Sequence, residues 1–131
     1  MSLEDVVTAF RESGSAGSVA PIAAAGERTY ADRFEAAAGV TVERFERIEE
    51  WKAVIGRAAG AVAPDSGAVH VAGTIGTPVV AVFPDDAQFS TQTARWRPWA
   101  ASHRIVRAGR DWPQQAGRSL RELLSATSGM Y

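Results

Sequence analysis

The chain has 131 residues, of which 46% are hydrophobic and 22% are charged, and its formal net charge is -1. This composition is typical of a single globular domain with enough apolar residues for a sizeable core. The near-zero charge argues against nucleic-acid binding, the absence of cysteine excludes disulfides and thiolate metal sites, and no apolar run approaches the roughly 18 residues of a membrane span. The acidic opening, Met1–Asp5, is unlike a signal peptide, so we expect a cytoplasmic protein.

The first half of the chain contains three segments with apolar residues at helical spacing. The first covers Leu3–Phe10, where Ser2 and Asp5 have the pattern of a capping box. The second covers Tyr30–Ala38 and the third covers Ile48–Ala58. Glycines follow the first two, so we expect three amphipathic helices.

Two candidate strands, Ser18–Ala24 and Val40–Phe45, lie between these helices. Pro21 interrupts the first, which favours a sheet edge or an early break. Glu27 follows this strand, at the edge where parallel strands end. A carboxylate there can accept hydrogen bonds from ribose hydroxyls, as in dinucleotide folds, or it can be a solvated residue at a helix start.

The chain is organised around a strand–turn–helix–strand unit. Ala61–Ala63 is a short apolar run, Pro64–Gly67 is a turn of small residues, Ala68–Ile75 is a helix-sized segment, and Val79–Phe83 is a second apolar run. Gly76, with a proline shortly after it, is a typical helix stop. In a parallel βαβ unit such a turn lies at the carboxyl end of the sheet, where ligands bind.

The chemistry of this turn suits an anion. A helix that begins near Gly67 or Ala68 leaves backbone N–H groups unpaired and has a positive dipole end. Gly67 allows a ligand to approach the backbone, and the Ser66 hydroxyl could donate a hydrogen bond. The turn therefore predicts a phosphate site. An equally good interpretation is an ordinary helix cap, made by Asp65 or Ser66, that binds nothing.

The run Asp65–His70, followed by Ala72, Gly76 and Pro78, resembles the signature of the ADP-heptose:lipopolysaccharide heptosyltransferase family. That family has Asp-(Ser/Thr)-Gly-x-x-His at this place, then an Ala-rich helix and a Pro that opens a strand. Its members are GT-B glycosyltransferases of bacterial lipopolysaccharide biosynthesis, with two Rossmann-like domains and the sugar nucleotide bound mainly to the second. The resemblance covers nearly the whole chain.

The resemblance implies that the backbone amides of Ser66, Gly67 and Ala68 hold a diphosphate, while Asp65 and His70 shape the loop. By residue type alone, His70 would more often be an ordinary core group.

The resemblance also implies that Glu27 serves the ribose and that the loop Phe45–Ile48, which includes Arg47, meets the base. The residue types of that loop fit an ordinary surface loop equally well.

The segment Pro84–Thr93 is polar and predicts a surface loop. Asp85 and Asp86 could bind a metal ion, but without a third ligand nearby they indicate a capped turn. We therefore predict no metal and no cofactor, in agreement with GT-B enzymes, which generally need no divalent ion.

The stretch Arg95–Arg110 contains five arginines and no acidic residue. Its tryptophans are best interpreted as locking a loop onto the core, while Arg95 and Arg97 stay open as ligand contacts.

The chain ends with a strand, His103–Arg107, and a helix in which Asp111 and Gln114 have the pattern of a capping box and Pro113 lies in the first turn. The alternation of helices and strands predicts an α/β, Rossmann-like fold, with a largely parallel sheet and helices on both faces. The resemblance implies that residues 1–131 are one nucleotide-sugar-binding domain, the second domain of a GT-B fold.

Such a domain would bind a nucleoside-diphosphate sugar, for example ADP-heptose, for glycosyl transfer. In that family the first domain binds the acceptor and supplies the catalytic base. This chain begins at the helix that follows the first strand of the second domain, so we expect no catalytic residue of its own. A partner domain or a homodimer would bind the acceptor. The alternatives are a non-catalytic nucleotide-binding module, a module that binds protein through the sheet edge left by that strand, or half of a sugar-nucleotide epimerase.

Overall fold

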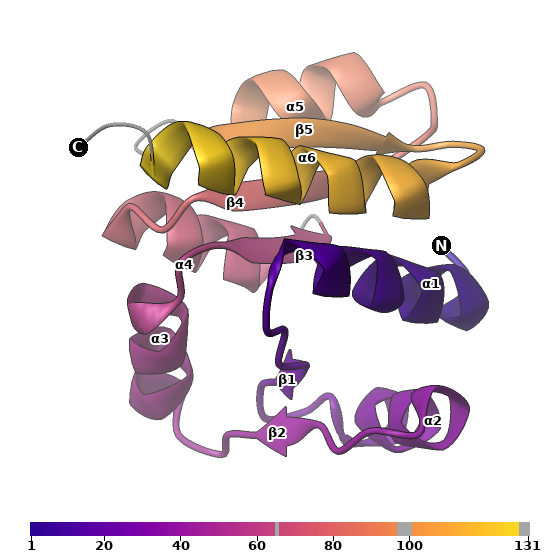
Figure 1. Cartoon of the computed structure of the whole chain (residues 1–131), viewed down its shortest axis with the longest axis vertical. Coiled ribbons are helices and arrows are strands. Elements are labelled where there is room, and N and C mark those ends of the chain that lie inside the picture. Colours follow the sequence, from indigo (N-terminus) through magenta and orange to yellow (C-terminus); the bar gives the residue numbers. More distant parts are fainter. Residues whose placement is uncertain (65, 97–100, 129–131) are drawn as a thin grey trace.

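The computed structural model describes residues 1–64, 66–96 and 101–128, and Figure 1 shows their arrangement. In chain order the elements are α1 (Leu3–Ser13), η1 (Gly14–Ala16), β1 (Ile22–Ala23), α2 (Arg28–Ala38), β2 (Glu43–Arg44), α3 (Ile48–Arg57), β3 (Ala61–Pro64), α4 (Gly67–Ile75), β4 (Val79–Pro84), α5 (Phe89–Trp96), β5 (His103–Ala108) and α6 (Trp112–Ser128).

Every strand pair is parallel, but the strands form two separate sheets. One has the order β1-β2 and the other has the order β3-β4-β5. Within the described residues no ladder joins β1 to β3, although β1 lies between β3 and β2 in Figure 1. The predicted α/β fold with parallel strands and flanking helices is confirmed, and the structure adds that the sheet is interrupted.

The larger sheet is centred on β4, where the residues Val79–Phe83 are at most 2% exposed. One face of it packs on α6 and α1, through Leu120, Leu123 and Ala9. The opposite face is covered by α3 and α4, through a cluster that includes Trp51 and Val69. The unbroken apolar run of β4 is what a central strand with helices on both sides requires.

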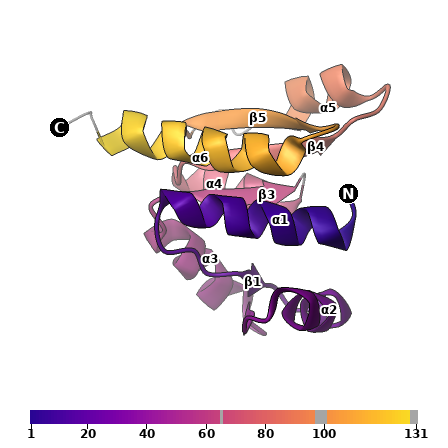
Figure 2. The same ribbon diagram turned by 45° about the vertical axis from the view of Figure 1, so that its right-hand side comes forward.

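The smaller sheet is held mainly by α1 and α2. Val7, Ala23, Phe34 and Val42 form its core, and the rings of Phe10 and Phe34 meet edge to face at 5.6 Å. Figure 2 shows α1 beside α6, above the smaller sheet. Helix α1 therefore connects the two sheets.

The predicted helices are confirmed, and the ends of α1, α2 and α4 are as predicted. The Ser2 hydroxyl accepts a hydrogen bond from the Asp5 N–H (3.1 Å), as the capping pattern predicts. Gly39 and Gly76 end α2 and α4 with φ of 70° and 95°, the left-handed conformation that glycine adopts without strain.

The two strands predicted in the first half are much shorter than expected. Ser18–Ala24 is reduced to β1 and Val40–Phe45 is reduced to β2, with two residues each. Pro21 offers no N–H to a ladder, and β2 has β1 as its only partner among the described strands, so pairing ends early.

The prediction of a loop over Pro84–Thr93 is wrong in its second half, because α5 begins at Phe89. The Thr93 hydroxyl donates to the Phe89 carbonyl (2.9 Å), and Phe89 packs against the apolar cluster under α3 and α4. Arg95 lies in this helix, whereas Arg97 lies outside the described residues.

The predicted capping box at the start of α6 is not formed. The Asp111 carbonyl does accept the Gln115 N–H (3.1 Å), but Asp111 has a φ of 63°, not the extended conformation usual for an N-cap. Pro113 does lie in the first turn of α6, as predicted.

Candidate functional site

The junction between β3 and α4 is built as the sequence predicts. β3 ends at Pro64, and α4 begins at Gly67, with Ser66 as its N-cap in an extended conformation (φ -158°, ψ 180°). On this helix Val69 and Ala72 are fully buried, which anchors it against the larger sheet. The start of α4 is therefore fixed to the most buried part of the molecule. Asp65, the first residue of the predicted motif, lies outside the described residues.

Within the described residues, the N–H groups of Gly67 and Ala68 at the start of α4 have no hydrogen-bond acceptor, as an anion site requires. The Ser66 hydroxyl makes no capping hydrogen bond, and the Ser66 carbonyl accepts the Val69 N–H at 3.2 Å. Nothing in the described part of the chain accepts a hydrogen bond from the N–H of Gly67 or Ala68. Of the two interpretations of Ser66, a side-chain cap is not observed. The open donors and the helix dipole suit a phosphate.

Trp51 connects this helix start to the smaller sheet. A Cβ atom at Gly67 would lie 3.8 Å from Cη2 of Trp51, an ordinary contact distance. The cluster around Trp51 also contains Ala68 on α4 and Ala24 and Phe45, which follow β1 and β2. The predicted phosphate and base segments thus share one apolar cluster.

A pocket of about 290 Å³ lies where β1 and β2 end. Its walls are the turn after β1, the start of α2, and the turn after β2. The lining residues are Ala23, Ala24, Ala25, Gly26, Arg28, Ala31, Arg44, Phe45 and Glu46. The pocket combines an aromatic ring with charged groups of both signs, which suits a nucleoside.

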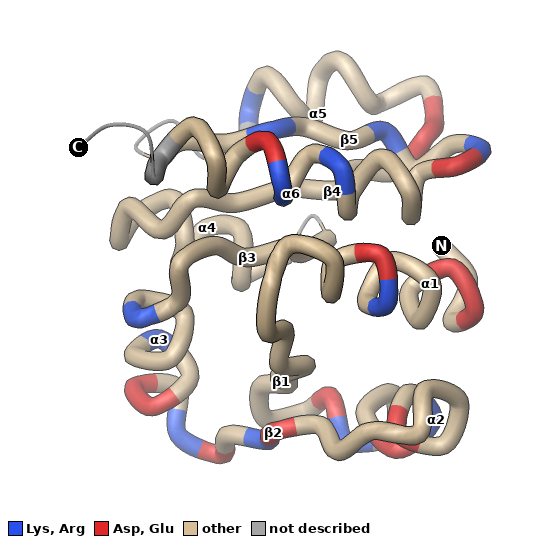
Figure 3. Tube along the Cα trace, viewed as in Figure 1, with Lys and Arg blue, Asp and Glu red and all other residues tan. Residues whose placement is uncertain are grey.

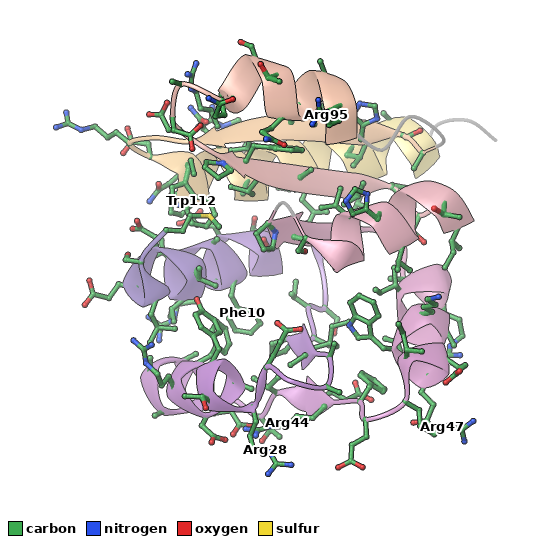
Figure 4. All side chains as sticks on the ribbon, turned by 180° about the vertical axis from the view of Figure 1, so that it is seen from behind. Phe10, Arg28, Arg44, Arg47, Arg95 and Trp112 are labelled. Carbon is green, nitrogen blue, oxygen red and sulfur yellow. The ribbon has the colours of Figure 1, made fainter. Side chains whose placement is uncertain are left out.

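The two arginines that line this pocket differ in their ion pairs. Arg44 makes ion pairs with Asp32 (2.7 Å) and Glu35 (2.6 Å). The hydrogen bond to Asp32 and the charge of Glu35 raise the pKa of Arg44. Arg28 has no acidic partner within the described ranges. Figure 4 shows Arg28 and Arg44 together at one end of the molecule, with Arg95 at the other end.

Glu27 lies beside this pocket at the N-cap of α2. Its carboxylate accepts the Ala24 N–H (3.1 Å), and the Glu27 N–H donates to the Ala24 carbonyl (3.3 Å). Glu27 therefore closes the turn after β1, while remaining exposed. Its predicted role toward a ribose stays a prediction.

The other two predicted contacts are more exposed. Arg47 forms a long ion pair with Glu50 (3.9 Å), and Figure 4 shows it apart from Arg28 and Arg44. His70 lies on the exposed side of α4, not in the core, and its carbonyl accepts the Thr74 hydroxyl (2.9 Å). Neither residue lines the pocket, so their roles also stay predictions.

The sequence analysis missed Arg28 and Arg44 as pocket residues. Arg28 could have been found, because it follows Glu27 in the turn after a parallel strand. Arg44 could not, because its position depends on Asp32 and Glu35, which α2 supplies.

The acidic pair after β4 is accounted for by local contacts. Asp85 binds Arg107 (2.5 Å), and Asp86 accepts the Gln88 N–H (2.8 Å), which is the capped turn that was favoured over a metal site. Arg107 also lies over the ring of Phe89, 4.4 Å from its centre. In the part of the chain that the structure describes, no three His, Asp or Glu residues are grouped as metal ligands.

Residues 26–123 match the profile of glycosyltransferase family 9, the heptosyltransferases. The chain belongs to this family. The matched region contains the β3–α4 junction, the larger sheet and the pocket residues from Gly26 onward, but not Ala23–Ala25. It excludes α1 and β1. No curated protein and no solved structure matches the chain.

Among the described helices, none combines the length and the hydropathy that crossing a membrane requires.

Proposed function

We propose that this family 9 chain binds the nucleoside-diphosphate sugar of a glycosyl transfer, with the diphosphate at the start of α4 and the nucleoside in the pocket beside β1 and β2. The donor we propose is ADP-heptose, used in the cytoplasm for bacterial cell-surface glycans.

One observation carries this proposal. The N–H groups of Gly67 and Ala68 have no acceptor in the described residues, and they lie at the carboxyl end of a parallel strand in a heptosyltransferase-family chain. In open parallel sheets this is where phosphates bind.

The charges of the helix start and of the pocket support this placement of the diphosphate and the nucleoside. A diphosphate carries negative charge and favours the positive end of α4. Ribose hydroxyls donate hydrogen bonds, so they favour carboxylates such as Glu27 and Glu46, and Phe45 offers a ring face to the base. The cationic Arg28 lies in the wall of the pocket, where it can face the α-phosphate side of the nucleoside.

In glycosyl transfer, the bond between the anomeric carbon and the β-phosphate oxygen breaks. The leaving diphosphate gains charge in the transition state, and fixed N–H donors at a helix start stabilise that charge without reorganising. This chain's contribution would be to bind and stabilise the leaving group. A partner domain or a second copy would bind the acceptor and supply the base that deprotonates it.

Titration calorimetry with ADP, UDP, GDP and AMP tests the proposal. ADP should bind at least about tenfold more tightly than AMP, because AMP lacks the phosphate that the helix start would hold. Equal affinity for ADP and AMP would remove the role of α4. No binding of any nucleotide would favour the interaction-module alternative.

An assay of the chain alone for glycosyl transfer and for hydrolysis of ADP-heptose separates an enzyme from a binding module. We expect binding without turnover. Turnover by the isolated chain would show that it carries catalytic residues that this proposal leaves out.

A further inference from the structure

A second pocket lies beyond the carboxyl end of the central strand β4, and the proposed contacts to the nucleoside and the diphosphate do not use it. It has a volume of about 260 Å³ and is formed by the turn after β4 and the first turn of α5. The lining residues are Pro84, Asp86, Gln88, Phe89 and Gln92. Ligands of open parallel sheets bind outside the carboxyl ends of the strands, so the position favours a binding site.

The polar side chains of this pocket have hydrogen-bonding groups without a partner in the described part of the chain. One carboxylate oxygen of Asp86 accepts the Gln88 N–H (2.8 Å), and no described group donates to the other. The side-chain amides of Gln88 and Gln92 likewise contact no described donor or acceptor. The Gln92 N–H donates to the Gln88 carbonyl (2.8 Å), so the two residues lie one turn apart on the same face of the helix.

This set of groups favours a neutral ligand with several hydroxyls. Asp86 is the only charged residue in the lining that the described residues provide, so the pocket repels anions such as phosphate. A carboxylate only accepts hydrogen bonds, whereas a Gln amide both donates and accepts. Each hydroxyl of a sugar ring also donates and accepts, and the ring presents hydroxyls on adjacent carbons. Adenine has a single amino group to donate, so it matches Asp86 and the two amides less well.

Phe89 gives the pocket an aromatic wall that β5 holds in place. The guanidinium of Arg107 lies over the Phe89 ring, 4.4 Å from its centre, and its Nε donates to Asp85 (2.5 Å). These contacts tie the turn after β4 to β5. The C–H groups of a sugar ring can pack on such a wall while the hydroxyls bind the polar side chains. Because the wall is already fixed, little ordering is needed when a ligand binds.

The pocket is one strand away from the start of α4. Pro64 at the end of β3 pairs with Val82, and β4 continues to Pro84. Parallel strands lie about 4.8 Å apart and rise about 3.3 Å per residue, so Pro84 is on the order of 8 Å from Pro64. Both turns lie at the same edge of the sheet (Figure 1). A sugar bonded to the β-phosphate of a diphosphate at Gly67 would therefore be within reach of this pocket.

We propose that the pocket between β4 and α5 binds the glycosyl group of the donor, with Asp86, Gln88 and Gln92 hydrogen-bonded to its hydroxyls and Phe89 packed on its ring. The volume is slightly below that of pockets for drug-sized ligands, which suits a single sugar ring. These residues would select the sugar, whereas α4 and the pocket beside β1 and β2 would hold the nucleotide. This inference rests on the proposed function, because the diphosphate at α4 brings the sugar to the pocket.

Titration calorimetry of the full chain with ADP-heptose and with ADP tests this inference. ADP-heptose should bind about tenfold more tightly than ADP, because it alone carries a sugar that reaches the pocket. Gln92→Ala should weaken the binding of ADP-heptose by about threefold to tenfold and leave the affinity for ADP unchanged. Thr91→Ala is the matched control, since Thr91 is an exposed residue of the same helix that does not line the pocket.

Nuclear magnetic resonance of the unaltered chain gives a readout that needs no variant. The side-chain NH₂ signals of Gln88 and Gln92 should shift when ADP-heptose is added, and they should not shift with ADP.

The outcomes separate this inference from the proposed function. If ADP binds and ADP-heptose binds no more tightly, the sugar site is wrong while the nucleotide site stands. If Gln92→Ala loses affinity for ADP, or if ADP alone shifts the Gln88 and Gln92 signals, the pocket holds the nucleotide and the inference is overturned. If neither compound binds, both proposals are wrong.

Discussion

The half of the molecule built on β3, β4 and β5 differs from the half built on β1 and β2 in how it is held together. Val79–Phe83 of β4 are at most 2% exposed, whereas both residues of β2, Glu43 and Arg44, are exposed. The larger half is held by ladders and two apolar layers, and the smaller half by α1, α2 and Trp51. The proposed donor would bind across the two, with its phosphates on the larger half.

The halves also differ in charge. Residues 1–60 contain 7 basic and 10 acidic residues, whereas residues 61–131 contain 7 basic and 5 acidic residues. Figure 3 shows Lys and Arg along β5 and α6. The half that would hold the diphosphate therefore has a net positive charge, and the half that would hold the ribose has a net negative charge.

The largest expected effect is on the free energy of unfolding, and it tests whether the two halves unfold separately. Phe83→Ala should destabilise the chain by about 3–5 kcal/mol, because it opens a cavity beside fully buried neighbours. Urea denaturation measures this change. The matched variant, Phe34→Ala, should speed amide exchange in α2 while the amides of β4 stay protected. Equal loss of protection in both sheets would mean that the two halves unfold as one unit.

A second substitution tests the phosphate side of the comparison. Gly67→Val should weaken ADP binding by at least about tenfold, because a branched side chain would cover the open N–H groups of α4. Titration calorimetry measures the affinity, and circular dichroism checks the fold. Gly14→Val is the control, since Gly14 has a helical φ of -59° and a Cβ there meets nothing within 4 Å. Unchanged affinity in Gly67→Val would contradict the assignment of this loop.

The ribose side should respond more weakly. In Glu27→Gln the amide oxygen can still accept the Ala24 N–H, so the turn is kept while the charge is lost. ADP affinity should fall by about threefold to tenfold. The wild-type chain should bind 2′-deoxy-ADP as weakly as the Glu27→Gln variant binds ADP. The variant itself should bind ADP and 2′-deoxy-ADP with equal affinity. A variant that still prefers ADP would show that another group recognises the hydroxyl.

The smallest effect is expected at Arg47. Its ion pair with Glu50 is long and exposed, so Arg47→Ala should change stability by about 0.5 kcal/mol or less. Because the side chain does not line the pocket, we expect ADP affinity to change by about twofold at most, through screened charge alone. A tenfold loss would instead make Arg47 a direct ligand contact.

The sequence by itself determined the unit from β3 to β4. A helix is specified by contacts between residues three and four positions apart. The apolar spacing of α4 and its end at Gly76 could therefore be predicted from the local sequence. The buried run Val79–Phe83 identified β4 in the same way. The turn at Ser66 and Gly67 predicted unpaired N–H groups at the helix start, and within the described residues the N–H groups of Gly67 and Ala68 have no acceptor.

Only the tertiary structure decided the extent of the strands and the composition of the pocket. A strand needs a partner that is distant in sequence, so Ser18–Ala24 and Val40–Phe45 could not reveal that their pairing stops after two residues. The polar sequence around Phe89 did not predict α5, because the packing of this helix depends on β4 and β5. Arg44 makes its ion pairs with carboxylates of another element, α2. The spacing of residues along the chain does not predict these contacts.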